Sequence, residues 1–164
     1  MQSDEIRRAR ADEAKRLSEI AYHSKAHWGY SDGFMDACRA ELTITPDYLK
    51  CNSTFVLSPG EEAVGFYALE RLSESRVELG HFFLWPGEIG RGRGRLLFEH
   101  ACVQALEHGF RTLVIASDPH AEDFYRALGA RRVGSTVSQS VAGRMLPLLE
   151  LDLSEGPIDS GGRG

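Results

Sequence analysis

Three glycines alternate with three arginines in Glu88-Ile89-Gly90-Arg91-Gly92-Arg93-Gly94-Arg95. This octapeptide lies between an apolar run at 77–85, which predicts a strand, and an amphipathic segment from Leu96, which predicts a helix. Glycines let the backbone take a positive φ and approach a ligand closely. A helix N-terminus offers unpaired N–H groups and the positive end of its dipole to an anion. The octapeptide therefore predicts a site for a phosphate-bearing ligand.

Other readings of the octapeptide fit less well. A Walker A loop needs Gly-Lys followed by Ser or Thr, and no lysine lies near these glycines. A Rossmann loop needs an acidic residue at a second strand end about twenty residues on. Asp118, the nearest candidate, leads directly into Pro119 and a new helix. A flexible surface hairpin remains an alternative for the glycines alone.

Length and composition indicate one globular domain. The chain has 164 residues, of which 42% are hydrophobic and 26% charged. A net charge of −5 argues against a nucleic-acid partner, so the arginines form a local patch. No stretch is long and apolar enough for a membrane span, and the charged N-terminus does not resemble a signal peptide. The three cysteines are widely spaced and odd in number, which indicates a reducing, cytoplasmic location.

Hydrophobic periodicity and turn residues predict the order of elements. The pattern predicts helices capped by Asp12 and Asp32, and a short helical turn from Pro46. A helix from the octapeptide to His108 and one from Asp118 to Gly129 follow. The predicted strands are 4–10, 54–57, 63–72, 77–85, 112–116, 132–138 and 145–153. We expect a single domain over 1–153 and a disordered tail over 154–164.

This order of elements resembles the GNAT superfamily of acyl-CoA-dependent N-acyltransferases over residues 4–153. The family's loop motif is Gln or Arg, two residues, Gly, one residue, then Gly or Ala, and it matches 89–94. The family's Asn-x-x-Ala-x-x-Phe-Tyr-x-x-x-Gly segment matches 118–129. Ile89 and Asp118 depart from the family's residues at their positions. The resemblance implies an α/β (α+β) fold with a mixed, mostly antiparallel central sheet flanked by helices.

The resemblance implies acetyl-CoA as the co-substrate. Backbone N–H groups of the glycine loop would bind the pyrophosphate, and the strand before the loop would pair with the pantetheine arm. Asp118 has a second interpretation as a helix N-cap, because a carboxylate is a poor neighbour for phosphate. The cofactor-binding residues so implied are Phe83, Leu84, Ile89, Gly90, Arg91, Gly92, Arg93, Gly94, Arg95, Asp118 and Phe124.

Two side chains match the family's catalytic positions. Tyr125 corresponds to the tyrosine that protonates the departing thiolate, with a packed core tyrosine as the alternative. Glu78 is the candidate base, directly or through a water, and alternation places Gly80 on the same face. We expect Gly80 to leave room there for the acceptor. Alternation turns His81, a second candidate base, to the opposite face, and a β-bulge near Gly80 is the alternative that would reverse this assignment.

The first two helices and their linker form one wall of the acceptor site in the family. His27, Trp28 and Tyr30 lie in this linker and can recognise an amine, or can form a hydrophobic plug between helices. The segment 143–147 is placed on the other side of the site. We expect no metal, because the His23–His27 spacing lacks a glutamate partner.

The predicted function is therefore transfer of an acetyl group from acetyl-CoA to a primary amine. The acceptor is a small molecule or a peptide, with neither nucleic acid nor membrane as a partner. The resemblance also allows a homodimer. One alternative is a non-catalytic CoA-binding regulatory module on the same fold, and another is a nucleotide-phosphate-binding protein of a different fold.

Overall fold

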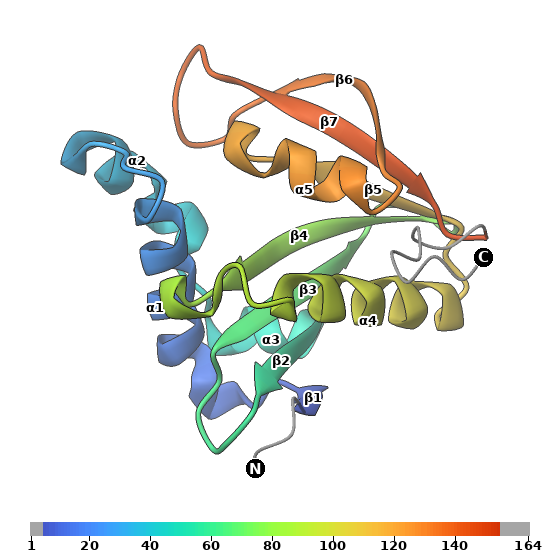
Figure 1. Cartoon of the computed structure of the whole chain (residues 1–164), viewed down its shortest axis with the longest axis horizontal. Coiled ribbons are helices and arrows are strands. Elements are labelled where there is room, and N and C mark those ends of the chain that lie inside the picture. Colours follow the sequence, from blue (N-terminus) through green and yellow to red (C-terminus); the bar gives the residue numbers. More distant parts are fainter. Residues whose placement is uncertain (1–4, 155–164) are drawn as a thin grey trace.

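The computed structural model describes residues 5–154 (Figure 1). The disorder expected for the tail at 154–164 falls outside the described residues, apart from Ser154, which lies in a turn. The first residue of the strand predicted at 4–10 lies outside them as well.

The described residues form one seven-stranded sheet in the order β1-β2-β3-β4-β5-β7-β6. All neighbouring strands are antiparallel except β4 and β5, which are parallel. The expected mixed, mostly antiparallel sheet flanked by helices is therefore confirmed. In chain order the elements are β1 (Glu5–Arg8), η1 (Ala11–Glu13), α1 (Ala14–Ala26), α2 (Asp32–Leu42), α3 (Pro46–Cys51), β2 (Ser53–Ser58), β3 (Gly65–Arg71), β4 (Arg76–Leu84), η2 (Pro86–Glu88), α4 (Arg93–Glu107), β5 (Thr112–Ala116), η3 (Pro119–Ala121), α5 (Glu122–Ala127), β6 (Arg131–Val137) and β7 (Met145–Asp152).

Two hydrophobic clusters cover opposite faces of the sheet. Alternate residues of β3 divide between them: Tyr67 packs with α4 and α5, and Phe66 packs with α1, α2 and α3. Both side chains are fully buried. Each helix group buries its apolar stripe against one sheet face, as helices do in layered α/β architectures.

Strands β4 and β5 pair over a short length and then separate. Their register joins Arg76 to Thr112, Val77 to Leu113 and Glu78 to Val114. Beyond Glu78, β4 continues for six residues to Leu84, whereas β5 continues to Ala116 beside β7. The opening between the two strands lies in the middle of the sheet, where the backbone groups of β4 face away from β3 without a strand partner.

Strand β4 contains a bulge at Gly80. Its register with β3 changes from Leu69–Leu79 to Ala68–His81, so Gly80 is an extra residue on β4. The bulge places His81 on the same face as Glu78, because the His81 ring contacts Phe66 on the α1–α3 side of the sheet. The expectation that simple alternation turns His81 to the opposite face is therefore wrong, since alternation fails at a bulge.

Two helix starts also differ from expectation. Helix α2 is capped by Ser31, whose hydroxyl accepts a hydrogen bond from the N–H of Phe34 at 3.1 Å. Asp32 is the first helical residue instead of the cap. A 3-10 turn, η1, contains Asp12 and precedes α1, and the Glu13 carboxylate accepts from the N–H of Arg10 at 2.8 Å. Both shifts are of one or two residues, as is usual for helix ends.

Candidate active site

A cavity of about 380 Å³ opens between β4 and β5. Residues 79–84 of β4 form one wall, and residues 115–118, at the end of β5 and beyond, form another. The glycine loop closes one end, and the other end reaches the end of α1, where Lys25 of the helix and Trp28 of the turn after it lie on the wall. The cavity therefore follows the opening in the sheet from the loop before α4 to the helices near the N-terminus.

The glycine loop takes the conformation that its sequence predicts. Gly90 and Gly92 have φ angles of +85° and +82°, and Gly92 is the N-cap of α4. Only glycine adopts such angles without strain. A Cβ on Gly94 would lie 3.2 Å from the Phe124 ring, so the first turn of α4 packs closely on α5. The loop presents the N-terminus of a 15-residue helix to the cavity.

The three arginines of the loop differ in their placement. Arg95 lines the cavity and pairs with Glu99 at 2.8 Å. Arg91 lies 3.7 Å from Glu88, and Arg93 forms an ion pair with the same carboxylate. Predicted cofactor residues on the cavity wall are Phe83, Leu84, Ile89, Gly90, Gly92, Gly94, Arg95, Asp118 and Phe124, whereas Arg91 and Arg93 lie beside it.

Tyr125 lies on the cavity wall among aromatic rings. Its ring centroid is 5.9 Å from that of Phe82, 5.6 Å from Phe98 and 5.2 Å from Phe124. Burial raises the pKa of Tyr125 well above its usual range, and the charge of Asp118 raises it further. The phenol therefore keeps its proton at neutral pH, as a hydrogen-bond donor or an acid must.

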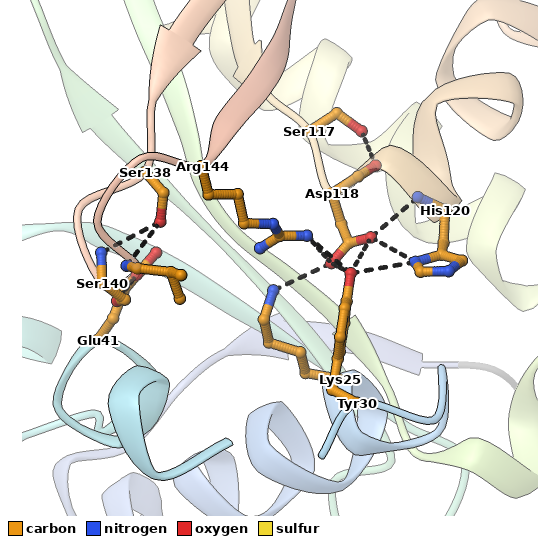
Figure 2. Close-up of polar contacts among 10 residues, drawn as sticks. Lys25, Tyr30, Glu41, Ser117, Asp118, His120, Ser138, Ser140 and Arg144 are labelled. Atoms are coloured by element: carbon orange, nitrogen blue, oxygen red, sulfur yellow. Dashed lines mark hydrogen bonds and ion pairs between the residues drawn. The ribbon is translucent and has the colours of Figure 1, made fainter. Parts of the chain in front are cut away.

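Asp118 is the centre of a polar network that joins three parts of the chain (Figure 2). Its carboxylate accepts from Lys25 Nζ at 3.0 Å and from the hydroxyl of Tyr30 at 2.9 Å. The N–H of His120 donates to Oδ1 at 2.9 Å, and Arg144 lies 3.6 Å from Oδ2. Both oxygens are thus occupied by protein donors, and Asp118 also caps η3 as its alternative interpretation predicts.

Electrostatics keep Asp118 ionised and Tyr30 protonated at neutral pH. Burial alone would raise the pKa of Asp118, but the N–H of His120 and the ammonium of Lys25 outweigh it and lower the pKa to about 2. Burial and Asp118 together raise the pKa of Tyr30 to about 12, so its hydroxyl stays protonated. That hydroxyl donates to Asp118 and accepts from Arg144 at 2.7 Å.

The predicted acceptor-site residues are only partly brought together. Trp28 lines the cavity and stacks on His120, with centroids 5.0 Å apart and planes within 8°. Tyr30 stacks on Phe34 at 4.0 Å, and its hydroxyl belongs to the Asp118 network. His27 contacts the edge of Trp28 at 5.7 Å and does not line the cavity.

Beside Gly80, Glu70 occupies the space that we expected to be open for the acceptor. A Cβ added to Gly80 would lie 2.3 Å from Glu70 Oε2, so the room expected at Gly80 is filled. Gly80 itself and His81 line the cavity, whereas Glu78 does not. Burial raises the pKa of Glu78, and the charges of Glu70 and Glu41 raise it further. Burial lowers the pKa of His81, and the same two carboxylates oppose that effect.

Four residues near the cavity were missed by sequence reasoning: Lys25, Glu41, Tyr48 and Glu70. Glu70 could have been found from the register of the hairpin, because it lies directly across from Glu78. Lys25 and Glu41 line the cavity from α1 and α2. No short-range pattern marks them, since their contacts are with Asp118 and with Ser140, which are far away in sequence.

Within residues 5–154 no group of three or more His, Cys, Asp or Glu side chains is placed to hold a metal ion. None of the described helices is long and apolar enough to cross a membrane.

The sheet opens between two parallel strands, with a glycine loop and a buried tyrosine at the opening, which is the arrangement that the resemblance to the GNAT superfamily implies. The model of the Acetyltransferase (GNAT) family matches residues 15–130. The chain therefore belongs to this family, in which transfer from acetyl-CoA is typical. No curated protein sequence matches the chain.

Solved structures with the same fold cover nearly the whole chain. The PaiA N-acetyltransferase from Thermoplasma acidophilum in complex with coenzyme A has a TM-score of 0.74 and 17% identity over 92% of this chain and 99% of that one. The apo form of YjaB from Escherichia coli has a TM-score of 0.64 and 26% identity over 92% and 97%. The ribosomal-protein-S18-alanine N-acetyltransferase from Escherichia coli has a TM-score of 0.66 and 18% identity over 99% and 98%.

Proposed function

We propose that this protein is an N-acetyltransferase that moves the acetyl group of acetyl-CoA directly to a primary amine. One observation carries the proposal: a single cavity runs from the N-terminus of α4, past Tyr125, to the acceptor end at His81. Such a cavity can hold a phosphate group at one end and a reacting thioester near its middle. A single domain over residues 1–153 is part of the proposal, since the two strands that border the cavity, β4 and β5, belong to one sheet.

The cofactor half of the site rests on the glycine loop and β4. Backbone N–H groups at the start of α4 would bind the pyrophosphate, which needs no specific side chain at Ile89. The unpaired edge of β4 beyond Glu78 would bind the pantetheine arm as a strand partner. The complex of the Thermoplasma acidophilum relative with coenzyme A supports this assignment.

The chemistry requires three events at one carbonyl. The amine nitrogen forms a bond to the thioester carbon and releases one proton to solvent, the carbon–sulfur bond breaks, and the sulfur leaves as a thiolate. Tyr125 would give its proton to that thiolate, because it lines the cavity and its raised pKa keeps the phenol protonated at neutral pH. Solvent would then restore the proton to Tyr125.

The ammonium form of the acceptor must lose a proton before it attacks. Two side chains on the same face of β4 are candidate bases. Glu78 would act through an ordered water, because it does not line the cavity, and its raised pKa makes it a stronger base than an ordinary carboxylate. His81 would act directly, because it lines the cavity and its lowered pKa keeps it neutral.

A screen of amines with acetyl-CoA tests the proposal, with release of the free thiol as the readout. We expect at least one primary amine to release thiol faster than acetyl-CoA hydrolyses alone. Gly92→Asp should abolish both release and acetyl-CoA binding, since it adds a side chain and a negative charge at the pyrophosphate position. Tight acetyl-CoA binding without release for any amine would favour the non-catalytic CoA-binding module instead.

A further inference from the structure

The space beside Gly80 is filled from the neighbouring strand. A Cβ added there would lie 2.3 Å from Oε2 and 2.5 Å from Cδ of Glu70. Gly80 is the extra residue of the β4 bulge, and Glu70 belongs to β3. The Glu70 carboxylate therefore packs against the backbone of the bulge, in a position that is open only because residue 80 has no side chain.

Tyr48 connects this carboxylate to His81. Its hydroxyl donates a hydrogen bond to Glu70 Oε2. Its ring meets the His81 ring edge-on, with centroids 5.3 Å apart and planes at 78°. Burial and the neighbouring Glu70 raise the pKa of Tyr48, so the hydroxyl stays protonated and continues to donate. Tyr48 thus fixes the Glu70 carboxylate and contacts His81 at the same time.

His81 lies where β4 meets the acceptor end of the cavity. Its ring packs against Phe66 and Phe83 at 6.0 Å each, in addition to Tyr48. Ionisable groups approach this region from every neighbouring element, and they are Lys25 of α1, Glu41 of α2, Tyr48 of α3, Glu70 of β3 and Glu78 of β4.

Burial among aromatic rings disfavours the imidazolium form of His81, and a nearby carboxylate stabilises it. Glu70 is the carboxylate that the bulge admits beside this residue. We propose that Glu70, held by Tyr48 in the space left by Gly80, is a positioning residue that fixes the His81 ring and sets its basicity, so that His81 accepts the proton of the amine. The inference rests on the proposed function for its catalytic part, but its structural part can be measured without any substrate.

The first experiment is an NMR titration of the histidine ring signals in the full chain, with His81 assigned by comparison with His81→Gln. Glu70→Gln should lower the pKa of His81 by about half a unit or more, because the imidazolium loses a negative charge that favours it. Gly80→Ala should lower it in the same direction, because the new methyl group displaces the carboxylate without removing it. Tyr48→Phe should also lower the pKa of His81, but by less, because the carboxylate of Glu70 stays nearby.

Glu74→Gln is the matched control. Glu74 is exposed in the turn between the same two strands, so this variant makes the same charge change away from the cavity. It should leave the His81 titration unchanged. If Gly80→Ala fails to fold, as judged by its thermal unfolding midpoint, Tyr48→Phe keeps the comparison possible, since it removes one oxygen and retains the ring.

The second experiment measures kcat/KM against pH with an amine found in the screen. In Glu70→Gln the acid limb of the kcat/KM profile should move to lower pH by the same amount as the pKa of His81 in the NMR titration. The plateau of kcat/KM should fall several-fold, because His81 becomes a weaker base. A His81 titration that does not move in Glu70→Gln, or one that moves while the acid limb stays fixed, overturns the inference. A wild type that turns over no amine contradicts the proposed function, whereas the NMR result still decides whether Glu70 sets the charge of His81.

Discussion

Tyr125 is enclosed by Phe82, Phe98 and Phe124, so its ring can be kept while its hydroxyl is removed. We expect Tyr125→Phe to lower kcat by about ten- to a thousandfold, because the thiolate loses its proton donor. The Kd for acetyl-CoA should change little, which calorimetry can check. A kcat equal to that of the wild type with a good acceptor would mean that Tyr125 is only a packing residue.

Asp118 makes a different kind of prediction, because its role is in stability. Its pKa falls from 3.8 to about 2 in the folded protein, where His120 and Lys25 outweigh the effect of burial. A carboxyl with a lowered folded-state pKa stabilises the protein above its unfolded-state pKa, and this contribution is lost as pH falls through the folded-state value. The contribution is therefore complete above about pH 4 and lost towards pH 2.

We expect Asp118→Asn to lower the free energy of unfolding at pH 7 by on the order of 2 kcal/mol, since Lys25 and Arg144 lose their shared counter-charge. Urea unfolding at a series of pH values measures this difference. The difference in the free energy of unfolding between the wild type and Asp118→Asn should narrow as the pH falls below about 4. Asp123→Asn, at an exposed position in α5, is the control. A difference that is constant across this pH range would contradict the assigned pKa.

At the scale of elements, helix α4 offers a matched pair of glycines. Gly92 precedes its first turn with φ +82°, and Gly109 follows its last turn with φ +92°. Alanine at either position adds about 1 kcal/mol of backbone strain, so both variants should lose similar stability. Only Gly92→Ala should weaken acetyl-CoA binding, by roughly tenfold or more, because only that end of the helix faces the cavity. Equal binding losses in both variants would mean that stability, not the loop, controls affinity.

The elements also show what sequence can predict. The strand predicted at 112–116 agrees with β5, because a compact apolar run between turn residues has one good interpretation. The sequence allowed a bulge near Gly80 only as an alternative to simple alternation, since a bulge depends on how β3 pairs with β4 and not on either strand alone. That one residue changed the face of His81 and so the choice of candidate bases.

The same limit applies to the site. The glycine loop and Tyr125 were predictable because their residues are close together in sequence and match family motifs. The Asp118 network was not, because it joins Lys25 to a residue 93 positions away, and Arg144 to Tyr30 across 114 positions. Such contacts arise from the packing of whole elements, and no local pattern records them.

At the scale of the whole molecule, the opening between β4 and β5 divides the sheet. The two halves are paired there over residues 76–78 and 112–114. A ligand that binds across this opening stabilises the folded state and not the unfolded chain. At about 100 times its Kd, acetyl-CoA should add about 2.7 kcal/mol and raise the Tm by roughly 5–10 °C. A phosphate-free pantetheine analogue at the same concentration should raise the Tm much less, and an equal shift would contradict the phosphate site at the glycine loop.

The position of β7 has a consequence for biosynthesis. This strand, Met145–Asp152, is the last along the described chain, yet it lies between β5 and β6 in the sheet. A nascent chain on the ribosome therefore carries β5 with an unpaired edge, and β6 with no neighbour, until residue 152 has emerged. Before that moment β2, β3 and β4 can pair as successive hairpins and β1 can pair with β2, so synthesis produces a folded half and an unfinished half. Chaperones that recognise exposed strand edges would act during this interval, and its length depends on the rate at which residues 138–152 are translated.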